Sequence, residues 1–233
     1  MPLPERGFDW PVAIDGRTWS AQATDHVLSL DGDGDWLAVA NDQLALHDGP
    51  FTVEARFRAE SFEKRVGLVN KTESAEFGIF LNAGVPSFIV HLGDRYATVE
   101  AGAAASARAW HHVAGVFDGK ELRLYVDGKL TARKAASGSR TRNALPLLVG
   151  ADVDGKGLGT SEFTGAIDEV RISSIARYAG EVVEPRAHHE PDDSTVLLLP
   201  MDVALGAMTL DLSRQRAHAR IRGDAVLAPS TSR

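Results

Sequence analysis

The amino-acid sequence predicts an all-β fold, an antiparallel sandwich of two sheets. Short strand-like runs recur along most of the chain, and turn residues such as Asp118 with Gly119 and Asp127 with Gly128 separate them. Outside a short stretch at 173–178, the sequence shows little of the 3.6-residue repeat that is typical of helices. Strands with one apolar face need a second layer to cover that face, which favours two stacked sheets.

The stretch 109–130 contains the clearest hairpin. Its first run, 110–117, has few polar residues on either face, which indicates a central strand covered on both sides. In its second run, Leu122, Leu124 and Val126 alternate with polar residues, as expected of a strand that buries one face. The Asp-Gly pair between the two runs predicts the connecting turn.

The segment 51–58 has the most regular alternation in the chain. Its apolar residues are expected to face the core, and its polar residues are expected to face solvent. The two sets are Phe51, Val53, Ala55 and Phe57 against Thr52, Glu54, Arg56 and Arg58. Further short strands are expected at 67–70, 77–82, 87–92, 145–150 and 163–172.

Composition narrows the classes of function. The formal net charge of −7 argues against nucleic-acid binding, because neutralising phosphates requires a basic surface. The absence of cysteine rules out disulfides and thiolate chemistry. No apolar run approaches the roughly 20 residues that a membrane span requires, so membrane insertion is not expected. The first ten residues lack a signal-peptide pattern, which leaves cytoplasmic and exported locations open.

Three segments in the same order resemble a known family. Residues 30–37, 110–128 and 163–172 read LDGDGDWL, WHHVAGVFDGKELRLYVDG and FTGAIDEVRI. They are similar to segments of the laminin-G-like and pentraxin-like jelly rolls of the concanavalin A-like lectin and glucanase superfamily. The resemblance implies a jelly-roll sandwich and a secreted or cell-surface location. It also implies a binding module for a polysaccharide or glycoprotein, although the same fold carries other functions.

The domain organisation follows from the same resemblance. Residues 1–26 are poorly patterned and are expected to form an arm packed on the sandwich, while 27–229 form a single domain. Within that domain, 190–229 resembles the segment that usually opens a laminin-G-like domain, and we expect it to supply closing strands. The alternative is that it begins a truncated second repeat.

The sequence favours a non-catalytic protein. Laminarinase-type members of the superfamily carry Glu-x-Asp followed by a second Glu, because a retaining glycosidase needs two carboxylates about 5 Å apart. The only Glu-x-Asp here is Glu190-Pro-Asp192, and Ser194 and Thr195 stand where the second Glu would fall. The alternatives are a structural or adhesion domain without a sugar site and, less favoured, a glycan hydrolase or lyase.

Resemblance to the pentraxins implies a calcium site in the loop 151–162. There Asp152 and Asp154 would contribute carboxylates and Val153 its carbonyl oxygen, since calcium prefers six to eight oxygen ligands. The relatives add an Asp-Asn pair from an earlier loop, but Ser74 and Ala75 stand at the matching positions here, so Glu162 or Glu76 would have to compensate. An ordinary acidic surface loop is the alternative.

A second candidate for calcium is the acidic loop at 31–35. Asp31, Asp33 and Asp35 alternate with glycine, which is typical either of a plain turn or of an oxygen-rich cation site. Asp168 is a candidate companion because it shares a strand face with Val170 and is therefore expected to point into the core. A buried carboxylate requires a cation or backbone donors, and both remain open for Asp168.

Basic residues near the C-terminus are candidates for ligand binding. They recur at every second position of 214–222 and would form one basic stripe on a strand, which Arg140 and Arg142 could extend. Such a stripe would suit an anionic glycan, whereas the alternative is a solvated outer face that protects a sheet edge. The stripe consists of Arg214, Arg216, His218, Arg220 and Arg222, and the aromatic candidates for neutral sugars are Trp10, Trp19, Trp36 and Tyr96.

Overall fold

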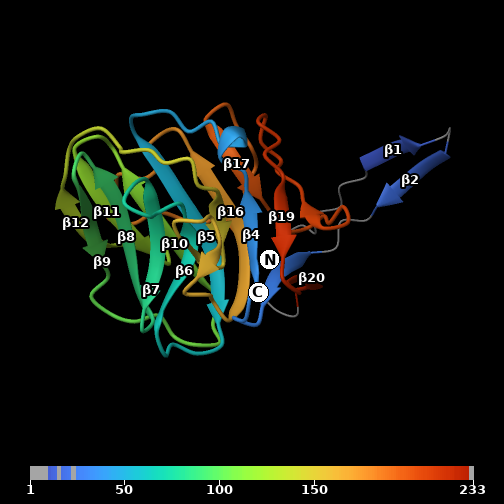
Figure 1. Ribbon diagram of the computed structural model, residues 1–233, viewed down its shortest axis with the longest axis horizontal. Helices are drawn as coiled ribbons and strands as arrows, with labels where there is room; N and C mark the ends of the chain where they lie inside the picture. The colour runs from blue at the N-terminus through green and yellow to red at the C-terminus, as the bar shows by residue number, and fades with distance from the viewer. Residues whose placement is uncertain (1–9, 15–16, 22–24, 231–233) are drawn as a thin grey trace.

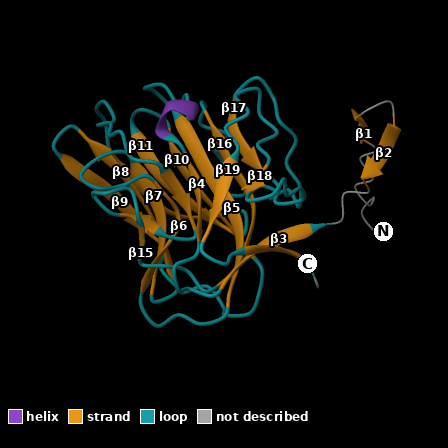
Figure 2. Cartoon of the chain, turned by 45° about the vertical axis from the view of Figure 1, so that its right-hand side comes forward, coloured by secondary structure: helices purple, strands orange, loops and turns teal. Residues whose placement is uncertain are grey.

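Two large antiparallel sheets lie face to face in the computed structural model, which describes residues 10–14, 17–21 and 25–230 (Figure 1). The described residues contain strands and one short 3₁₀ turn, η1 (Asn41–Gln43), and no α-helix, so the predicted all-β two-sheet sandwich is confirmed (Figure 2). No helix in the described part of the chain is long and apolar enough to cross a membrane.

The first sheet is built around β5 and β16. Its order is β12 (Lys129–Ala135), β11 (Glu121–Val126), β10 (His111–Phe117), β5 (Phe51–Ala59), β16 (Gly165–Ser173), β3 (His26–Leu30) and β20 (Val226–Pro229). The strand β17 (Thr195–Leu199) also pairs with β16.

The second sheet packs against the first. Its order is β18 (Met208–Thr209), β19 (Ala219–Arg222), β4 (Trp36–Val39), β13 (Leu147–Val149), β6 (Arg65–Asn70), β7 (Phe77–Asn82), β8 (Val85–Leu92) and β9 (Arg95–Glu100). Two small hairpins complete the described strands: β1 (Trp10–Ile14) with β2 (Arg17–Ala21), and β14 (Asp152–Val153) with β15 (Gly159–Thr160).

The hairpin predicted at 109–130 forms as β10 and β11. The Asp118 side chain accepts hydrogen bonds from the backbone N–H groups of Lys120 and Glu121 at 2.9 and 2.8 Å, which closes the turn. β10 pairs with β5 on its other side and all its residues after His111 are buried. The prediction of a central strand covered on both faces is therefore confirmed.

The main core lies between the two sheets and is rich in aromatic rings. Phe51 of β5 lies 5.1 to 6.1 Å, between ring centroids, from Phe77, Phe88 and Phe117. At Gly115 of β10 a Cβ atom would come within 2.3 Å of the Phe88 ring, so glycine lets the sheets approach closely here. Such dense contact between the inner faces is what holds a sandwich together.

The polar side of β5 was predicted wrongly in part. Thr52 and Glu54 are fully buried and do not face solvent, whereas Arg56 and Arg58 are only partly buried. The connection from β16 to β17, residues 174–194, lies over the outer face of the first sheet and removes this surface from water. Its backbone bonds directly to the strand, because the Thr52 hydroxyl donates to the carbonyl of Ile175 at 2.8 Å.

The orientation of Asp168 was also predicted wrongly. A β-bulge follows it in β16, with Glu169 at a positive φ of 48°, and this extra residue reverses the alternation. Asp168 is paired with Arg56 of β5, and directly paired residues share a face. Asp168 is thus fully buried on the outer side of the sheet and not in the core with Val170.

The ends of the chain contribute differently. Residues 190–229 add β17 and β20 to the first sheet and β18 and β19 to the second. Within 1–26, β1 and β2 pair with each other and with neither large sheet, while 1–9, 15–16 and 22–24 lie outside the described residues. The packing of an N-terminal arm on the sandwich stays a prediction.

Candidate functional site

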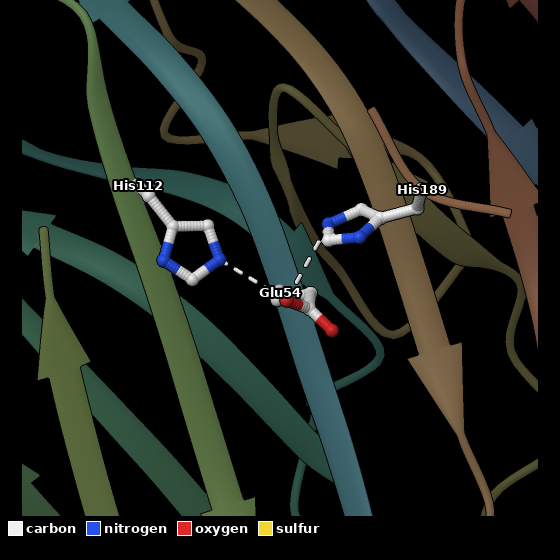
Figure 3. Close-up of side chains that lie close together, drawn as sticks. All are labelled: Glu54, His112 and His189. Carbon is white, nitrogen blue, oxygen red and sulfur yellow. Dashed lines mark hydrogen bonds and ion pairs between the residues drawn. The ribbon is translucent and has the colours of Figure 1, made fainter. Parts of the chain in front are cut away.

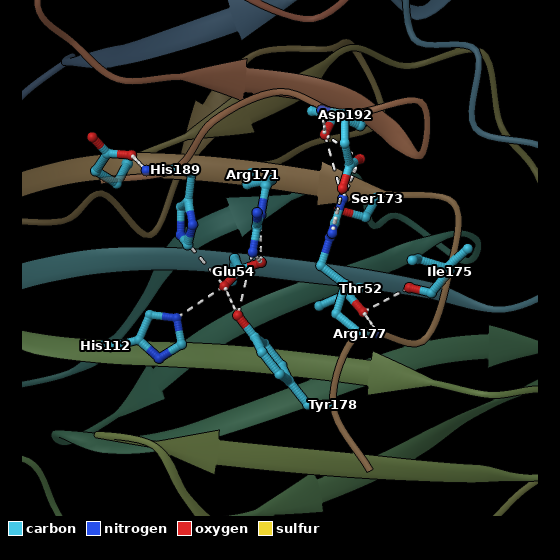
Figure 4. Close-up of polar contacts among 12 residues, drawn as sticks. Thr52, Glu54, His112, Arg171, Ser173, Ile175, Arg177, Tyr178, His189 and Asp192 are labelled. Carbon is cyan, nitrogen blue, oxygen red and sulfur yellow. Dashed lines mark hydrogen bonds and ion pairs between the residues drawn. The ribbon is translucent and has the colours of Figure 1, made fainter. Parts of the chain in front are cut away.

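A buried polar cluster lies between the first sheet and the 174–194 connection (Figures 3 and 4). We call it the Glu54 cluster; it comprises Glu54 (β5), His112 (β10), Arg171 (β16), Tyr178 and His189. Glu54 Oε1 accepts from Arg171 Nε at 2.7 Å, and Oε2 accepts from the Tyr178 hydroxyl at 2.7 Å. The Nε2 atoms of His112 and His189 lie 3.1 and 3.5 Å from Oε2. Both carboxylate oxygens are therefore engaged.

Burial and charge set the protonation of this cluster. Burial alone would raise the pKa of Glu54, but the hydrogen bond to His112 and the charges of His189 and Arg171 outweigh it and lower this pKa to about 2. Burial lowers the pKa of His189 to about 4 and raises the pKa of Tyr178. At neutral pH the cluster thus holds one carboxylate, one guanidinium and a neutral His189.

The Glu54 cluster has the donor types of a metal site but works as a structural network. Glu54, His112 and His189 place one ligand atom each within 4.8 Å of the others. A metal ion would have to displace donors already on Glu54 and would stand beside the Arg171 guanidinium, 2.7 Å from the same carboxylate. The cluster instead fixes the connection over the sheet. Sequence reasoning missed it because Glu54 was expected on the solvent side.

The acidic loop forms a compact group of carboxylates with a partner from the C-terminal segment. Ligand oxygens of Asp31, Asp35 and Asp224 all lie within 4.8 Å of one another. Asp35 is 2% exposed, it accepts from the backbone N–H of Asp224 at 2.8 Å, and its burial raises its pKa. Among the described residues, Asp33 and Asp168 do not join this group. Asp224 had no sequence signal, since only the pairing of β19 with β4 brings it here.

The residues predicted for a pentraxin-like calcium site lie on and beside the β14–β15 hairpin. Asp152 accepts from the Thr72 hydroxyl and pairs with Arg65 at 3.2 Å, while Asp154 accepts from two backbone N–H groups of its own turn. Val153 belongs to the β14–β15 hairpin and Glu162 follows it, and no group of three close side-chain ligand atoms forms here among the described residues. Asp152 is thus held by contacts with Thr72 and Arg65 and Asp154 by its own turn, and calcium binding at this loop stays a prediction.

The predicted basic stripe is interrupted in the structure. Only 219–222 are extended, as β19, and Arg216 adopts a positive φ of 52° in the preceding turn. Arg214 pairs with Asp193 at 2.7 Å on the exposed surface. Arg140 is buried beside Glu76 and belongs to a different part of the surface, with Arg142 near it. A single continuous stripe was therefore a wrong interpretation of the alternation.

His218, Arg220 and Arg222 remain together and line a groove. β19 runs beside β4, with Arg220 opposite Ala38 and Arg222 opposite Trp36, so alternate residues of both strands face outward. The groove has a volume of about 410 Å³, and Leu158, 54% exposed, is on its rim. We call it the Trp36 groove; its lining is Trp36, Ala38, Ala40, Gln43, Pro146, Gly157, Leu158, His218, Arg220 and Arg222.

Local backbone fixes the aromatic wall of the Trp36 groove. A Cβ atom at Gly159 of β15 would lie 2.4 Å from the Trp36 ring, so the glycine allows the indole to rest on the backbone of this hairpin. No acidic residue is among those that line the groove. An indole and two guanidinium groups therefore share one open surface, which suits a ligand with apolar faces and negative charge. Sequence reasoning named Trp36, Arg220 and Arg222 but did not bring them together.

The two stacked antiparallel sheets define a jelly-roll sandwich. A laminin-G-type family model, described as the concanavalin A-like lectin/glucanases superfamily, matches residues 31–183. This range covers well over half of the chain, and the chain belongs to this superfamily. The resemblance stated from the three sequence segments is confirmed.

Solved structures share the fold at low sequence identity. A candidate carbohydrate-binding protein from Bacteroides ovatus has a TM-score of 0.72 at 15% identity, over 90% of this chain and 61% of that chain. The CBM40 of a Ruminococcus gnavus IT-sialidase has a TM-score of 0.54 at 16% identity, over 67% and 94% of the two chains. Domains LG4-5 of the mouse laminin α1 chain have 0.53 at 20%, over 76% and 52%.

These comparisons concern the fold. The chain spans less than two thirds of the Bacteroides protein and of the laminin fragment. No curated protein matched the sequence.

Proposed function

We propose that this protein is a non-catalytic binding module that holds a carbohydrate in the Trp36 groove. The observation that carries the proposal is the presence of Trp36, Arg220 and Arg222 in one groove on the outer side of the second sheet. An indole face packs well against the C–H face of a sugar ring, and guanidinium groups bind carboxylate or sulfate by paired hydrogen bonds.

The lining favours an anionic glycan over a neutral one. Two arginines and His218 are not balanced by any acidic residue in the groove. The names of structural neighbours support a carbohydrate ligand: one is a candidate carbohydrate-binding protein, and a CBM40 structure with a TM-score of 0.56 is bound to α2,3-sialyllactose. A polysaccharide or glycoprotein outside the cell is the corresponding partner.

Binding without catalysis is supported by the chemistry of the groove. Retaining hydrolysis of a glycoside requires two carboxylates about 5 Å apart beside the sugar. The residues that line the Trp36 groove supply neither a nucleophilic carboxylate nor an acid of that kind. The ligand would leave this site chemically unchanged.

Calcium is proposed as a structural aid at the acidic group. Asp35 directly precedes Trp36 of β4, and Asp224 follows the Arg222 end of β19 by two residues. Carboxylate oxygens are the ligands that calcium prefers, and Asp31, Asp35 and Asp224 supply them from two segments. A bound ion would hold together the ends of the two strands that line the groove.

A glycan array followed by calorimetric titration tests the function. We expect binding to sulfated or carboxylated glycans, with at least about tenfold weaker affinity for Trp36→Ala and for Arg220→Gln, since each loses a principal contact. Arg133→Gln is the matched control, because Arg133 of β12 is exposed on the first sheet and its loss changes the net charge equally.

Two results would contradict the proposal. Equal affinity of wild type and Trp36→Ala would show that the ligand does not bind in the Trp36 groove. An array that stays blank for neutral and anionic glycans alike would favour a structural or adhesion domain without a sugar site.

A further inference from the structure

A small pocket lined by cations lies beside the Trp36 groove. Lys71 follows β6 and Glu76 precedes β7, while the loop before β13 supplies Arg140, Arg142 and Asn143. We call it the cationic pocket; Asn41, Leu44 and Leu46 complete its lining. The turn η1 separates the two sites, since Gln43 lines the groove and Asn41 lines the pocket.

Positive charge is in excess among the buried walls of this pocket. Lys71 is 2% exposed and Arg140 is 6% exposed, and both rely on the buried carboxylate of Glu76. Lys71 Nζ lies 3.4 Å from Glu76 Oε1, and Arg140 Nη1 lies 2.5 Å from Oε2. Two buried cations therefore share one anion, although buried charges are usually paired one to one.

Arg142 adds a third cation at the rim. Its Nε lies 4.0 Å from Asp48, and the two side chains are 49% and 53% exposed, so solvent weakens this pair. Its Nη2 donates to the carbonyl of Leu46 at 3.1 Å, which aligns the guanidinium with the pocket wall. The charge of Arg142 is thus only weakly compensated.

The protonation of the walls reflects the same imbalance. Burial lowers the pKa of Lys71 and of Arg140, and Glu76 opposes this effect in both. Arg142 lowers the pKa of both groups further by repulsion. An anion in the pocket would offset the repulsion among the three cations, because it would attract each of them at short range.

Hydrogen-bond accounting agrees with the charges. The three protons of Lys71 are engaged by Glu76 and by the backbone and side-chain oxygens of Asn143. The Nη atoms of Arg140 donate hydrogen bonds to Glu76 and to the carbonyls of Leu46 and His47. Its Nε is buried without a hydrogen-bond partner among the described residues, near the rings of Phe51 and Phe77. The donor capacity open to a ligand is therefore mainly that of the half-exposed Arg142 at the rim.

The size of the pocket limits what can enter. Its volume is about 150 Å³, against about 410 Å³ for the Trp36 groove. Pockets for whole small-molecule ligands usually exceed about 300 Å³. A sulfate or carboxylate group fits, whereas a complete sugar ring belongs in the larger groove.

We propose that the cationic pocket binds one oxoanion group, a sulfate or a carboxylate, as a free ion or as a substituent of a glycan. In the second case the inference rests on the proposed function, and the glycan in the Trp36 groove would pass over η1 to place its anionic substituent between Lys71, Arg140 and Arg142.

Titration of the full chain with sodium sulfate tests the pocket directly. Ionic strength is held constant with sodium chloride, and the backbone amide signals of Thr72 and Asn143 are followed by NMR. We expect saturable shifts in the wild type and at least fivefold weaker binding for Arg142→Gln, which changes a half-exposed side chain and should fold normally. Arg133→Gln should bind sulfate as the wild type does.

The outcomes separate this inference from the proposed function. Shifts that do not saturate, or an equal loss in Arg133→Gln, would overturn the pocket as an anion site. A second titration uses a sulfated oligosaccharide: weaker binding by Arg142→Gln places the substituent of the glycan in the pocket, and unchanged binding assigns the pocket to the free ion. If no glycan binds while sulfate still saturates, the proposed function fails and the pocket stands.

Discussion

Mild acid should destabilise this fold through His189. The side chain is buried in the Glu54 cluster, and burial lowers its pKa from the ordinary 6.5 to about 4. As the pH falls below 6.5, the unfolded chain takes up a proton at this residue while the folded chain does not. Stability therefore rises with pH between about 4 and 6.5 and is lost as the pH falls through this window.

The two pKa values give the size of the effect. The full shift spans 2.5 units, which corresponds to about 3 kcal/mol at 1.36 kcal/mol per unit. Between pH 7 and pH 5 the unfolding free energy should fall by about 2 kcal/mol, because over the lower half of this range the unfolded chain binds nearly one proton more than the folded chain. Glu54, with a pKa lowered from 4.5 to about 2, adds its own loss only below pH 4.5, so the two contributions can be separated.

Urea unfolding at pH 7 and pH 5 measures this loss. The variant His189→Gln keeps a polar side chain that does not titrate, and its stability should change less between the two pH values, by about 2 kcal/mol. His47→Gln is the matched control, because His47 is exposed and its replacement should leave the pH dependence unchanged. If wild type and His189→Gln lose the same free energy, the assignment to His189 is refuted.

Two further predictions concern the other carboxylates. Glu54→Gln should cost about 3–5 kcal/mol of unfolding free energy by urea titration, since Arg171 would stay buried without its anion; a cost near that of a surface variant would contradict the network. Millimolar calcium should raise the melting temperature of the wild type, and a chelator should reverse this increase. Asp35→Asn should abolish the increase, whereas the exposed control Asp94→Asn should keep it. An unchanged melting temperature of the wild type in calcium would refute the proposed calcium site.

Local signals in the sequence predicted local structure. The turn between β10 and β11 follows from Asp118 and Gly119, which act within a few residues. Likewise, the apolar alternation of β5 correctly identified its core face, including Phe51 and Phe57. Patterns of this kind depend only on backbone geometry and burial of one face.

Predictions that depended on distant segments were less successful. Glu54 was assigned to solvent because nothing in its own strand indicates that 174–194 crosses above it. One extra residue at Glu169 reversed the face of Asp168. Asp224 joins Asp35 only through the register of β19 on β4, about 190 positions along the chain. The Trp36 groove arises from that same long-range pairing.

The pairing of β3 with β20 has a consequence for how the sandwich can be built. His26 of β3 lies opposite Pro229 of β20. In chain order these are the first and last strands of the first sheet, so their pairing closes a loop of about 200 residues. Closure of so long a loop makes formation of this sheet edge a late and slow step, and during synthesis it must wait for the final strand to leave the ribosome. Adjacent entry and exit points also mean that the whole sandwich could be inserted into a surface loop of another protein with little distortion of either partner.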